Sequence, residues 1–255
     1  MRYWTIAGVL LLLSAQVHAG EPLKGWLEWV HEVEMRVVEN GVVDDVLVAT
    51  GQHVKAGDLL LRMDQREAKA LLLEARARVA RARVAGEKAQ RELARAEELF
   101  SRGLIAVEEL KDAELAQVAA VAEEEAAKAA EESRSVALER TELRAPFDGI
   151  IVARHVWKGA VIYKTLQQEP LIVIAPDDQM LARALVTASV LRSFKPNQPV
   201  HVKVNGRVRE GRVYSQGVQS VRVELEGAVY YLDIIFDAKP NELLRPSETV
   251  QILTP

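Results

Sequence analysis

Residues 41–54 read GVVDDVLVATGQHV, and residues 149–162 read GIIVARHVWKGAVI. The two stretches look like copies of each other at one constant offset, which also aligns Gly51 with Gly159. Apolar residues punctuated by glycine turns are typical of short β-strands. The sequence therefore predicts a small β domain whose two halves lie far apart in the chain.

The stretch between the two copies has the period of α-helices. One helix is predicted over about 65–101 and a second over about 107–140, separated by a short segment that contains Gly103, a residue suited to the left-handed cap of a helix. Asp64 and Glu67 have the spacing of a capping box at the start of the first helix. Two helices of similar length joined by a few residues fold back on each other, so we expect an antiparallel hairpin.

Small and apolar residues repeat in heptads along both predicted helices, as they do in coiled coils. In the first helix the repeat falls on Leu72, Ala75, Val79, Ala82, Gly86, Ala89, Leu93, Ala96 and Phe100. In the second helix it falls on Leu115, Ala119, Ala122, Ala126, Ala129, Ser133 and Val136. We expect these two rows to face each other and to form the seam of the hairpin.

The C-terminal third of the chain has the pattern of short strands separated by turn residues. The expected strands are 181–186, 200–204, 211–214, 221–225, 229–236 and 250–253. Many short strands with regular turns favour a small β-barrel. The segment 27–37, in which Val33, Met35 and Val37 alternate with charged residues, is expected to complete this barrel.

Composition limits the possible functions. The chain has 255 residues, a formal net charge of −4 and no cysteine. The near-neutral charge gives no reason to expect a nucleic-acid partner, and the lack of cysteine excludes disulfides, thiol catalysis and Cys-based metal sites. Arg2, an apolar run over 4–13 and small residues up to Ala19 predict a secretory signal peptide over 1–19, cleaved after Ala19. The alternative, a retained anchor, is disfavoured because the run is well short of the ~20 residues that span a bilayer.

Taken in order, these features resemble the periplasmic adaptor subunits of tripartite efflux pumps, the membrane fusion protein or HlyD-like family. The resemblance rests on GQHVKAGDLL at 51–60, the hairpin, LRAPFDG at 143–149 and LLRP at 243–246. It implies a non-catalytic protein without cofactor that links an inner-membrane transporter of the RND, ABC or MFS type to an outer-membrane channel. It also implies a homo-oligomeric ring in the periplasm, held at the inner membrane through protein partners.

The hairpin tip is where the resemblance implies contact with the channel. Arg95 and Leu99 match the family's tip pattern, whereas Ala106 stands where a serine is usual. The candidate partner-binding residues are Arg95, Leu99, Arg102, Leu104 and Ile105. The alternative is that Arg95 is a solvated face residue and Leu99 a core residue. Without the serine hydroxyl the second helix lacks a side-chain cap worth on the order of 1 kcal/mol.

Two other functions are alternatives to the adaptor. A periplasmic coiled-coil chaperone or scaffold protein is compatible with the hairpin but leaves the repeated β halves unexplained. A biotinyl or lipoyl carrier needs a modifiable lysine on a tight turn, and the chain enters the hairpin at that point instead. The histidines are isolated, and neither a phosphate-binding loop nor a nucleophile elbow occurs, so no catalytic or metal site is predicted.

The predicted fold class is α+β and elongated: a lipoyl-like β domain split by a long antiparallel coiled-coil hairpin and followed by a small β-barrel. Two further departures from the family are expected, namely the absence of a membrane-proximal domain and Ser247 in place of the usual glycine of the last turn. The expected segments are a signal peptide at 1–19, an N-terminal segment with the first barrel strand at 20–37, lipoyl-like halves at 38–63 and 141–178, the hairpin at 64–140 and the barrel at 179–255.

Overall fold

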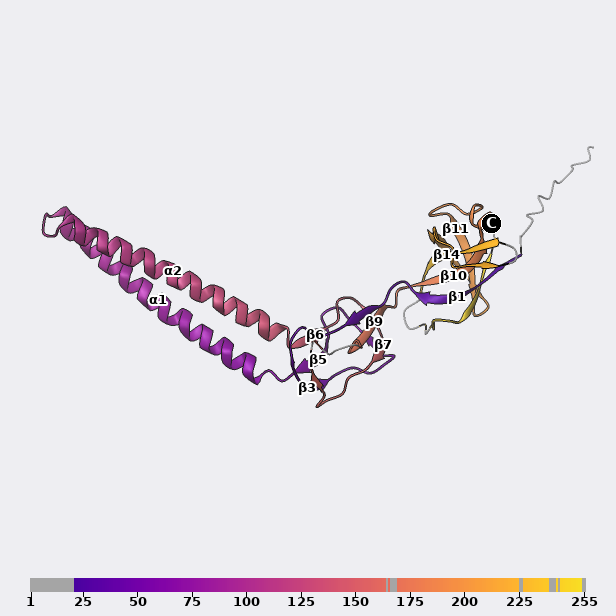
Figure 1. Cartoon of the computed structure of the whole chain (residues 1–255), viewed down its shortest axis with the longest axis horizontal. Helices are drawn as coiled ribbons and strands as arrows, with labels where there is room; N and C mark the ends of the chain where they lie inside the picture. The colour runs from indigo at the N-terminus through magenta and orange to yellow at the C-terminus, as the bar shows by residue number, and fades with distance from the viewer. Residues whose placement is uncertain are drawn as a thin grey trace, which may run out of the picture. The chain divides into compact units, whose positions relative to one another are not determined.

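The computed structural model describes residues 21–163, 165, 169–224, 227–238, 242 and 244–253. The predicted signal peptide lies outside these residues, so its cleavage stays a prediction. The chain forms two compact units: residues 32–176 make one, and the segments before and after them make the other (Figure 1). Within the described ranges, no helix combines the length and apolar character needed to cross a lipid bilayer.

The two sequence copies form equivalent strands in the first unit. The first copy contains β3 (Gly41–Val46) and β4 (His53–Val54), and the second contains β7 (Gly149–Arg154) and β8 (Val161–Ile162). Each copy pairs with the other: β3 runs antiparallel to β8, and β7 runs antiparallel to β4. The prediction that the two copies form two halves of one β domain is therefore confirmed. Each half supplies strands that pair with strands of the other half.

Equivalent residues of the two copies make equivalent backbone hydrogen bonds to the other copy. The amide of Gly51 donates to the carbonyl of Ile151, and the amide of Gly159 donates to the carbonyl of Val43, both at 2.8 Å. The two glycines have φ values of +82° and +84°, in the left-handed region that disfavours residues with a Cβ. This requirement explains why a glycine recurs at the same place in each copy.

Four more strands complete the two sheets of this unit. They are β2 (Val33–Met35), β5 (Leu59–Met63), β6 (Glu142–Arg144) and β9 (Ile172–Pro176). The sheets have the strand orders β2-β9-β7-β4 and β6-β5-β3-β8. Their shared core contains Leu60, Leu61, Ile151, Ile172 and Ile174, all almost fully buried. Buried aliphatic side chains from both halves thus hold the split domain together.

The prediction of one barrel strand over residues 27–37 is wrong. The segment 27–37 is not a single barrel strand, because β1 (Leu23–Trp29) ends before it and β2 follows a break. β1 pairs with barrel strands, whereas β2 pairs with β9 of the split domain. The alternation of Val33 and Met35 with charged residues marks a half-buried strand in either sheet, so it could not decide between them.

The hairpin consists of α1 (Arg66–Ser101) and α2 (Val107–Glu139), close to the predicted bounds (Figure 1). At the start of α1 the carboxylate of Asp64 accepts the amide of Arg66 at 3.0 Å. The N-cap residue is Gln65, which makes no side-chain cap bond, so the capping box predicted from Asp64 and Glu67 is wrong. The guanidinium of Arg66 donates to the same carboxylate and lowers the pKa of Asp64 to about 2. The predicted α1 seam is confirmed where Leu72, Ala75 and two further alanines are buried.

The predicted seam of α2 is wrong. Leu115, the largest residue of that row, is 67% exposed, and Ala119, Ala122, Ala126 and Ala129 are exposed as well. The row that meets α1 is more polar and comprises Leu110, Ala113, Gln117, Ala120, Glu124, Ala127 and Glu131. Polar pairs span the seam: Glu131 contacts Arg76 at 3.1 Å, and Gln117 donates to Gln90 at 3.4 Å. Long polar side chains on α2 have partners on α1, which a row of alanines would not supply.

The second unit is a closed antiparallel barrel. Its strands are β1, β10 (Gln179–Thr187), β11 (Pro199–Val204), β12 (Arg207–Gln216), β14 (Gly227–Asp237) and β15 (Thr249–Leu253). They follow the order β10-β1-β15-β11-β12-β14, and β14 pairs back onto β10. A short strand β13 (Arg222–Glu224) extends the sheet beside β14, and the helix α3 (Ala188–Leu191) follows β10. The predicted barrel is thereby confirmed.

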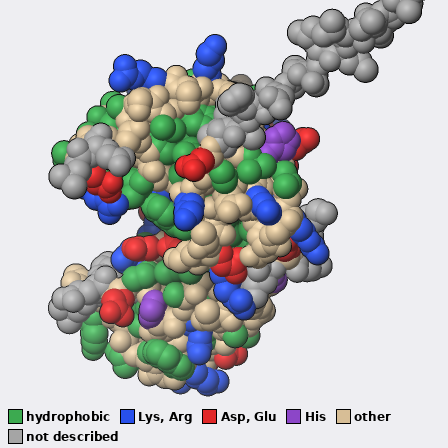
Figure 2. Space-filling view, turned by 90° about the vertical axis from the view of Figure 1, so that its right-hand side faces the viewer, with side chains coloured by type: hydrophobic (Ala, Val, Ile, Leu, Met, Phe, Trp, Pro, Cys, Tyr) green, Lys and Arg blue, Asp and Glu red, His purple; other side chains and the backbone are tan. Residues whose placement is uncertain are grey.

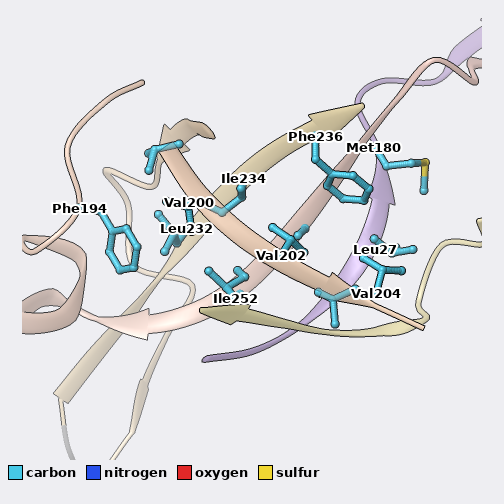
Figure 3. Packing of buried hydrophobic residues seen from close by; sticks show 14 of the residues in the cluster. Leu27, Met180, Phe194, Val200, Val202, Val204, Leu232, Ile234, Phe236 and Ile252 are labelled. Carbon is cyan, nitrogen blue, oxygen red and sulfur yellow. The ribbon is translucent and has the colours of Figure 1, made fainter. Parts of the chain in front are cut away.

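Aliphatic and aromatic side chains from every barrel strand converge on one core. Figure 3 shows Leu27, Val202, Ile234, Phe236 and Ile252 pointing toward one another between the strands. On the surface, the face seen in Figure 2 mixes hydrophobic side chains with charges of both signs. Alternation of inward apolar and outward-facing residues, strongest in β11, accounts for the shared core.

Ser247 occupies a strained turn before β15. Its φ is +69°, which confirms that this position calls for the glycine that is usual there. The turn is held because the amide of Ser247 donates to the carbonyl of Leu27 at 2.8 Å, while Leu27 donates back to Glu248 at 2.9 Å. These bonds continue the ladder between β1 and β15.

Candidate functional site at the hairpin tip

The turn at the hairpin tip is a Schellman motif. Gly103 has a φ of +71°, as predicted for a left-handed cap. Its amide donates to Phe100 at 2.9 Å, and the amide of Leu104 donates to Leu99 at 3.0 Å. These two bonds satisfy the carbonyls of Leu99 and Phe100 in the last turn of α1, and the chain reverses within a few residues.

The structure places the five predicted tip residues in different environments. Leu104 projects outward with 66% of its side chain exposed, whereas Ile105 and Leu99 are half-buried. Arg95 and Arg102 are exposed, and Arg102 is paired with Glu98 one turn earlier. An exposed pair of this kind contributes little to stability, so Arg102 can exchange its partner at low cost.

Two apolar residues at the tip were not among the predicted contacts. Phe100 is 40% exposed and Val107, the first residue of α2, is 50% exposed. Phe100 was predicted to lie in the seam, but Leu99 takes the more buried position as the helix reaches the turn. The signal for both residues was available, because an apolar side chain beside a tight turn has little core to enter. We call Phe100, Leu104 and Val107 the tip cluster.

The return helix starts without a side-chain cap, as the sequence indicates. Ala106 is the N-cap residue, with φ −76° and ψ 156°, and its methyl group cannot accept a hydrogen bond. Glu108 and Glu109 lie in the first turn, where their charge favours the helix dipole. The start of α2 therefore depends on the dipole and on backbone bonds in place of a side-chain cap.

Replacing Ala106 with serine should stabilise the start of α2 by about 1 kcal/mol, because the hydroxyl can accept a first-turn amide. Hydrogen exchange at the amides of Glu108 and Glu109 should slow about fivefold in the A106S variant. Ala116→Ser, which places the same side chain at an exposed position inside the helix, is the control and should not slow exchange there. Equal protection in both variants would contradict the capping explanation.

The base of the hairpin is tied to the split domain by one side chain from each end. Gln65 donates to the hydroxyl of Thr141 at 2.9 Å, and that hydroxyl donates to the carbonyl of Leu138. The amide of Met63 donates to the carbonyl of Thr141 at 2.9 Å. Thr141 is buried although it is polar, which its hydrogen bonds explain.

The split domain gives the carrier alternative no support. β5 ends at Met63 and α1 begins at Arg66, so the hairpin occupies the place where a carrier would present its lysine. In the part of the chain that the structure describes, no group of three His, Asp or Glu side chains is placed to hold a metal ion. The groove between the helices, about 610 Å³ in volume, is lined mainly by alanines together with Arg78, Arg81 and Glu123.

Comparison with known proteins identifies the family. The CzcB-like, barrel-sandwich hybrid domain family matches residues 31–172, which is more than half of the chain. The chain belongs to this family. Its barrel-sandwich hybrid domain is the split domain described above, with the hairpin inserted between its halves.

Relatives with solved structures share this architecture. A MacA–MexA chimera containing the Pseudomonas aeruginosa MexA α-hairpin matches with a TM-score of 0.67 and 23% identity, over 91% of this chain and 80% of that one. The membrane fusion protein Spr0693 from Streptococcus pneumoniae matches with a TM-score of 0.71 and 16% identity, over 91% and 97%. These likenesses confirm the predicted membrane fusion protein fold.

A curated relative is the multidrug resistance protein MdtA of Pectobacterium carotovorum. It is 28% identical over 207 residues, which cover 76% of this chain and 47% of that protein. The chain thus spans about half the length of the curated relatives it matches first.

Proposed function

We propose that this barrel-sandwich hybrid protein is a non-catalytic adaptor of the bacterial envelope, which joins an inner-membrane transporter to an outer-membrane channel. In this proposal the protein is exported by its N-terminal signal peptide and acts in the periplasm as a homo-oligomeric ring. The hairpin tip binds the channel, and the rest of the chain serves the transporter.

The observation that carries the proposal is the exposed tip cluster. Phe100, Leu104 and Val107 gather at the end of a hairpin whose first helix has 36 residues. At 1.5 Å per residue this helix reaches about 54 Å. Apolar side chains displayed together at the far end of such an arm are typical of a contact with another protein.

The names of the relatives support a transport role. MdtA of Pectobacterium carotovorum is named a multidrug resistance protein, and MacA of Yersinia pestis, 24% identical over 245 residues, is named a macrolide export protein. The first name refers to resistance against several drugs, and the second refers to export. We propose the same general role here, without assigning the exported compound or the transporter class.

Cross-linking in the host cell tests the tip contact. The chain has no cysteine, so a single Leu104→Cys substitution supplies a unique reactive thiol. We expect a short cross-linker to join this variant to one outer-membrane channel, because Leu104 is 66% exposed at the tip. Leu104→Asp should reduce export-dependent resistance at least about tenfold, since a charge buried in an apolar contact costs over 1.4 kcal/mol.

Leu73→Cys is the matched control. Leu73 is a leucine of the same hairpin with a similar exposure of 69%, but it lies near the base of α1. Cross-linking of both variants to the channel with equal yield would contradict a specific tip contact. Capture of assorted unfolded proteins by Leu104→Cys would instead favour the chaperone alternative.

A further inference from the structure

The turn between β7 and β8 displays a group of apolar side chains to solvent. Trp157 in this turn, Val161 of β8 and Tyr163 just after β8 are each between 56% and 60% exposed. Val42 of β3, which is 43% exposed, stands directly opposite Val161 and extends the apolar surface. We call Val42, Trp157, Val161 and Tyr163 the turn patch.

The other copy of the repeat folds into the same turn. In each copy the first residue of the turn accepts a hydrogen bond from the amide three residues later, at 3.1 Å, as at Ala49 and at Trp157. The inward positions are apolar and buried in both copies: Val48 and Val54 in one, Val156 and Ile162 in the other. Folding therefore makes the same demands on both turns.

The outward positions of the two copies differ in chemistry. The residues that correspond to the turn patch in the first copy are exposed but small or polar, namely Ala49 for Trp157, His53 for Val161 and Lys55 for Tyr163. A β domain that folds with such residues on one turn does not need tryptophan and tyrosine on the other. Clustered Trp and Tyr side chains on a surface are typical of protein interfaces, so the turn patch is suited to bind another protein.

Local contacts hold Trp157 in place. The guanidinium of Arg154 lies 5.4 Å from the centre of the indole ring, and it also donates to the carbonyl of Val156 at 3.1 Å. Val156 is buried in the core, and the amide of Gly159 ties the turn to β3 at 2.8 Å. A large side chain that is already ordered loses little conformational entropy on binding, so Trp157 is suited to anchor a contact.

Positive charges flank the turn patch. Lys158 follows Trp157 directly and is exposed, and Arg154 lies beside the indole ring. Among the residues that the structure describes, no carboxylate pairs with either of these two cations. A second turn patch would bring like charges together, so contact of the patch with itself is disfavoured. The complementary surface is apolar and has carboxylates at its edge.

We infer that the turn patch binds an apolar surface with an acidic edge on the periplasmic part of the inner-membrane transporter. The inference rests on the proposed function and deepens it, because it assigns a surface and a chemistry to the second partner. The hairpin tip, which is assigned to the channel, lies at the end of a helix about 54 Å long that starts directly after β5. A partner bound at the tip therefore leaves the turn patch open to a different protein.

Photo-cross-linking in the host cell tests this contact. The cell carries a tagged copy of the transporter with which the chain restores export, and the full-length Val161→Cys variant is labelled with a thiol-reactive benzophenone. His53→Cys, at the equivalent position of the other copy, is the matched control. We expect Val161→Cys to give at least about tenfold more adduct with the tagged transporter than His53→Cys, because only the first label lies in the contact.

Further substitutions in the Val161→Cys chain test the chemistry of the contact. Trp157→Ala should lower the adduct yield at least about tenfold, since it removes the aromatic anchor. This variant should fold, because alanine occupies the equivalent position in the other turn. Lys158→Glu should lower the yield about fivefold by repelling the carboxylates, whereas Lys55→Glu should leave it unchanged. An unchanged yield in Trp157→Ala or in Lys158→Glu overturns the inference.

The remaining outcomes separate this inference from the proposed function. Adducts of Val161→Cys with a second copy of the chain, or binding to phosphatidylethanolamine–phosphatidylglycerol vesicles that Trp157→Ala abolishes, would assign the patch to another occupant and overturn the inference. Failure to capture the transporter, while Leu104→Cys still traps a channel, would reject this contact and leave the adaptor proposal standing. Capture of the transporter without any channel at Leu104→Cys would reject the channel contact and support this one.

Discussion

Replacing Gly149 with alanine is expected to lower the free energy of unfolding of the barrel-sandwich hybrid domain by about 3 to 5 kcal/mol. A Cβ at this position would lie 2.2 Å from the carbonyl oxygen of Ala175 and 3.0 Å from its carbonyl carbon. Both atoms belong to the backbone of β9, which pairs with β7 along its whole length. The strands must separate to admit the methyl group, so hydrogen exchange in β7 and β9 should accelerate strongly.

Gly51→Ala is the matched control for this prediction. Gly51 also lies in the repeat, but a Cβ there would meet nothing within 4 Å. Glycine is favoured at this position only because the backbone φ is +82°. The control should therefore lose about 1 to 2 kcal/mol, the cost of a left-handed residue. Equal losses at Gly51 and Gly149 would show that close approach of the two strands is not the cause at Gly149.

Replacing Asp233 with alanine is expected to lower the free energy of unfolding of the barrel by about 2 to 4 kcal/mol, because it breaks a partly buried ion pair. Arg183 donates to both carboxylate oxygens of Asp233, at 2.7 and 3.1 Å, and Ser215 donates to the same carboxylate at 2.7 Å. Asp233 is buried, and the hydrogen bonds that it accepts from Arg183, together with its charge, raise the pKa of Arg183.

The remaining partners of Arg183 limit the loss. Its guanidinium also contacts Glu28 and lies 4.7 Å from the ring centre of Tyr231, so the charge is not left alone. Glu224→Ala, which removes an exposed partner of Arg222, is the control and should change stability by no more than about 0.5 kcal/mol. The stability of both variants is measured by denaturant unfolding and by hydrogen exchange in β10 and β14. If Asp233→Ala lowered the free energy of unfolding by no more than the control does, the ion pair would make no net contribution to stability.

Local patterns in the sequence were enough to predict most elements. The constant offset between the two copies corresponds to β3 with β7 and β4 with β8, because glycines of positive φ must recur wherever the same turn recurs. The hairpin bounds followed from heptad periodicity and from Gly103. The barrel strands followed from alternation and turn residues. Each of these signals depends on neighbours within a few residues.

The choice between equivalent faces could not be predicted in this way. α2 has an apolar row and a mixed row, and the mixed row meets α1 because Gln117 and Glu131 have partners on the opposing helix. The same limit applied to Val33 and Met35, whose alternation suits a strand in either unit. It also applied to Leu99 and Phe100, of which only one can point into the seam where the helix ends.

The sequence alone determined the order of the parts: a β domain in two halves, a hairpin between them and a barrel after them. Those features arise from backbone geometry and short-range periodicity, which residues close in the chain specify. Only the tertiary structure decided which strands exchange between the halves, which face of α2 is free and which side chains cluster at the tip. These features depend on contacts between segments far apart in the chain, where pairing energies and not local pattern select the outcome.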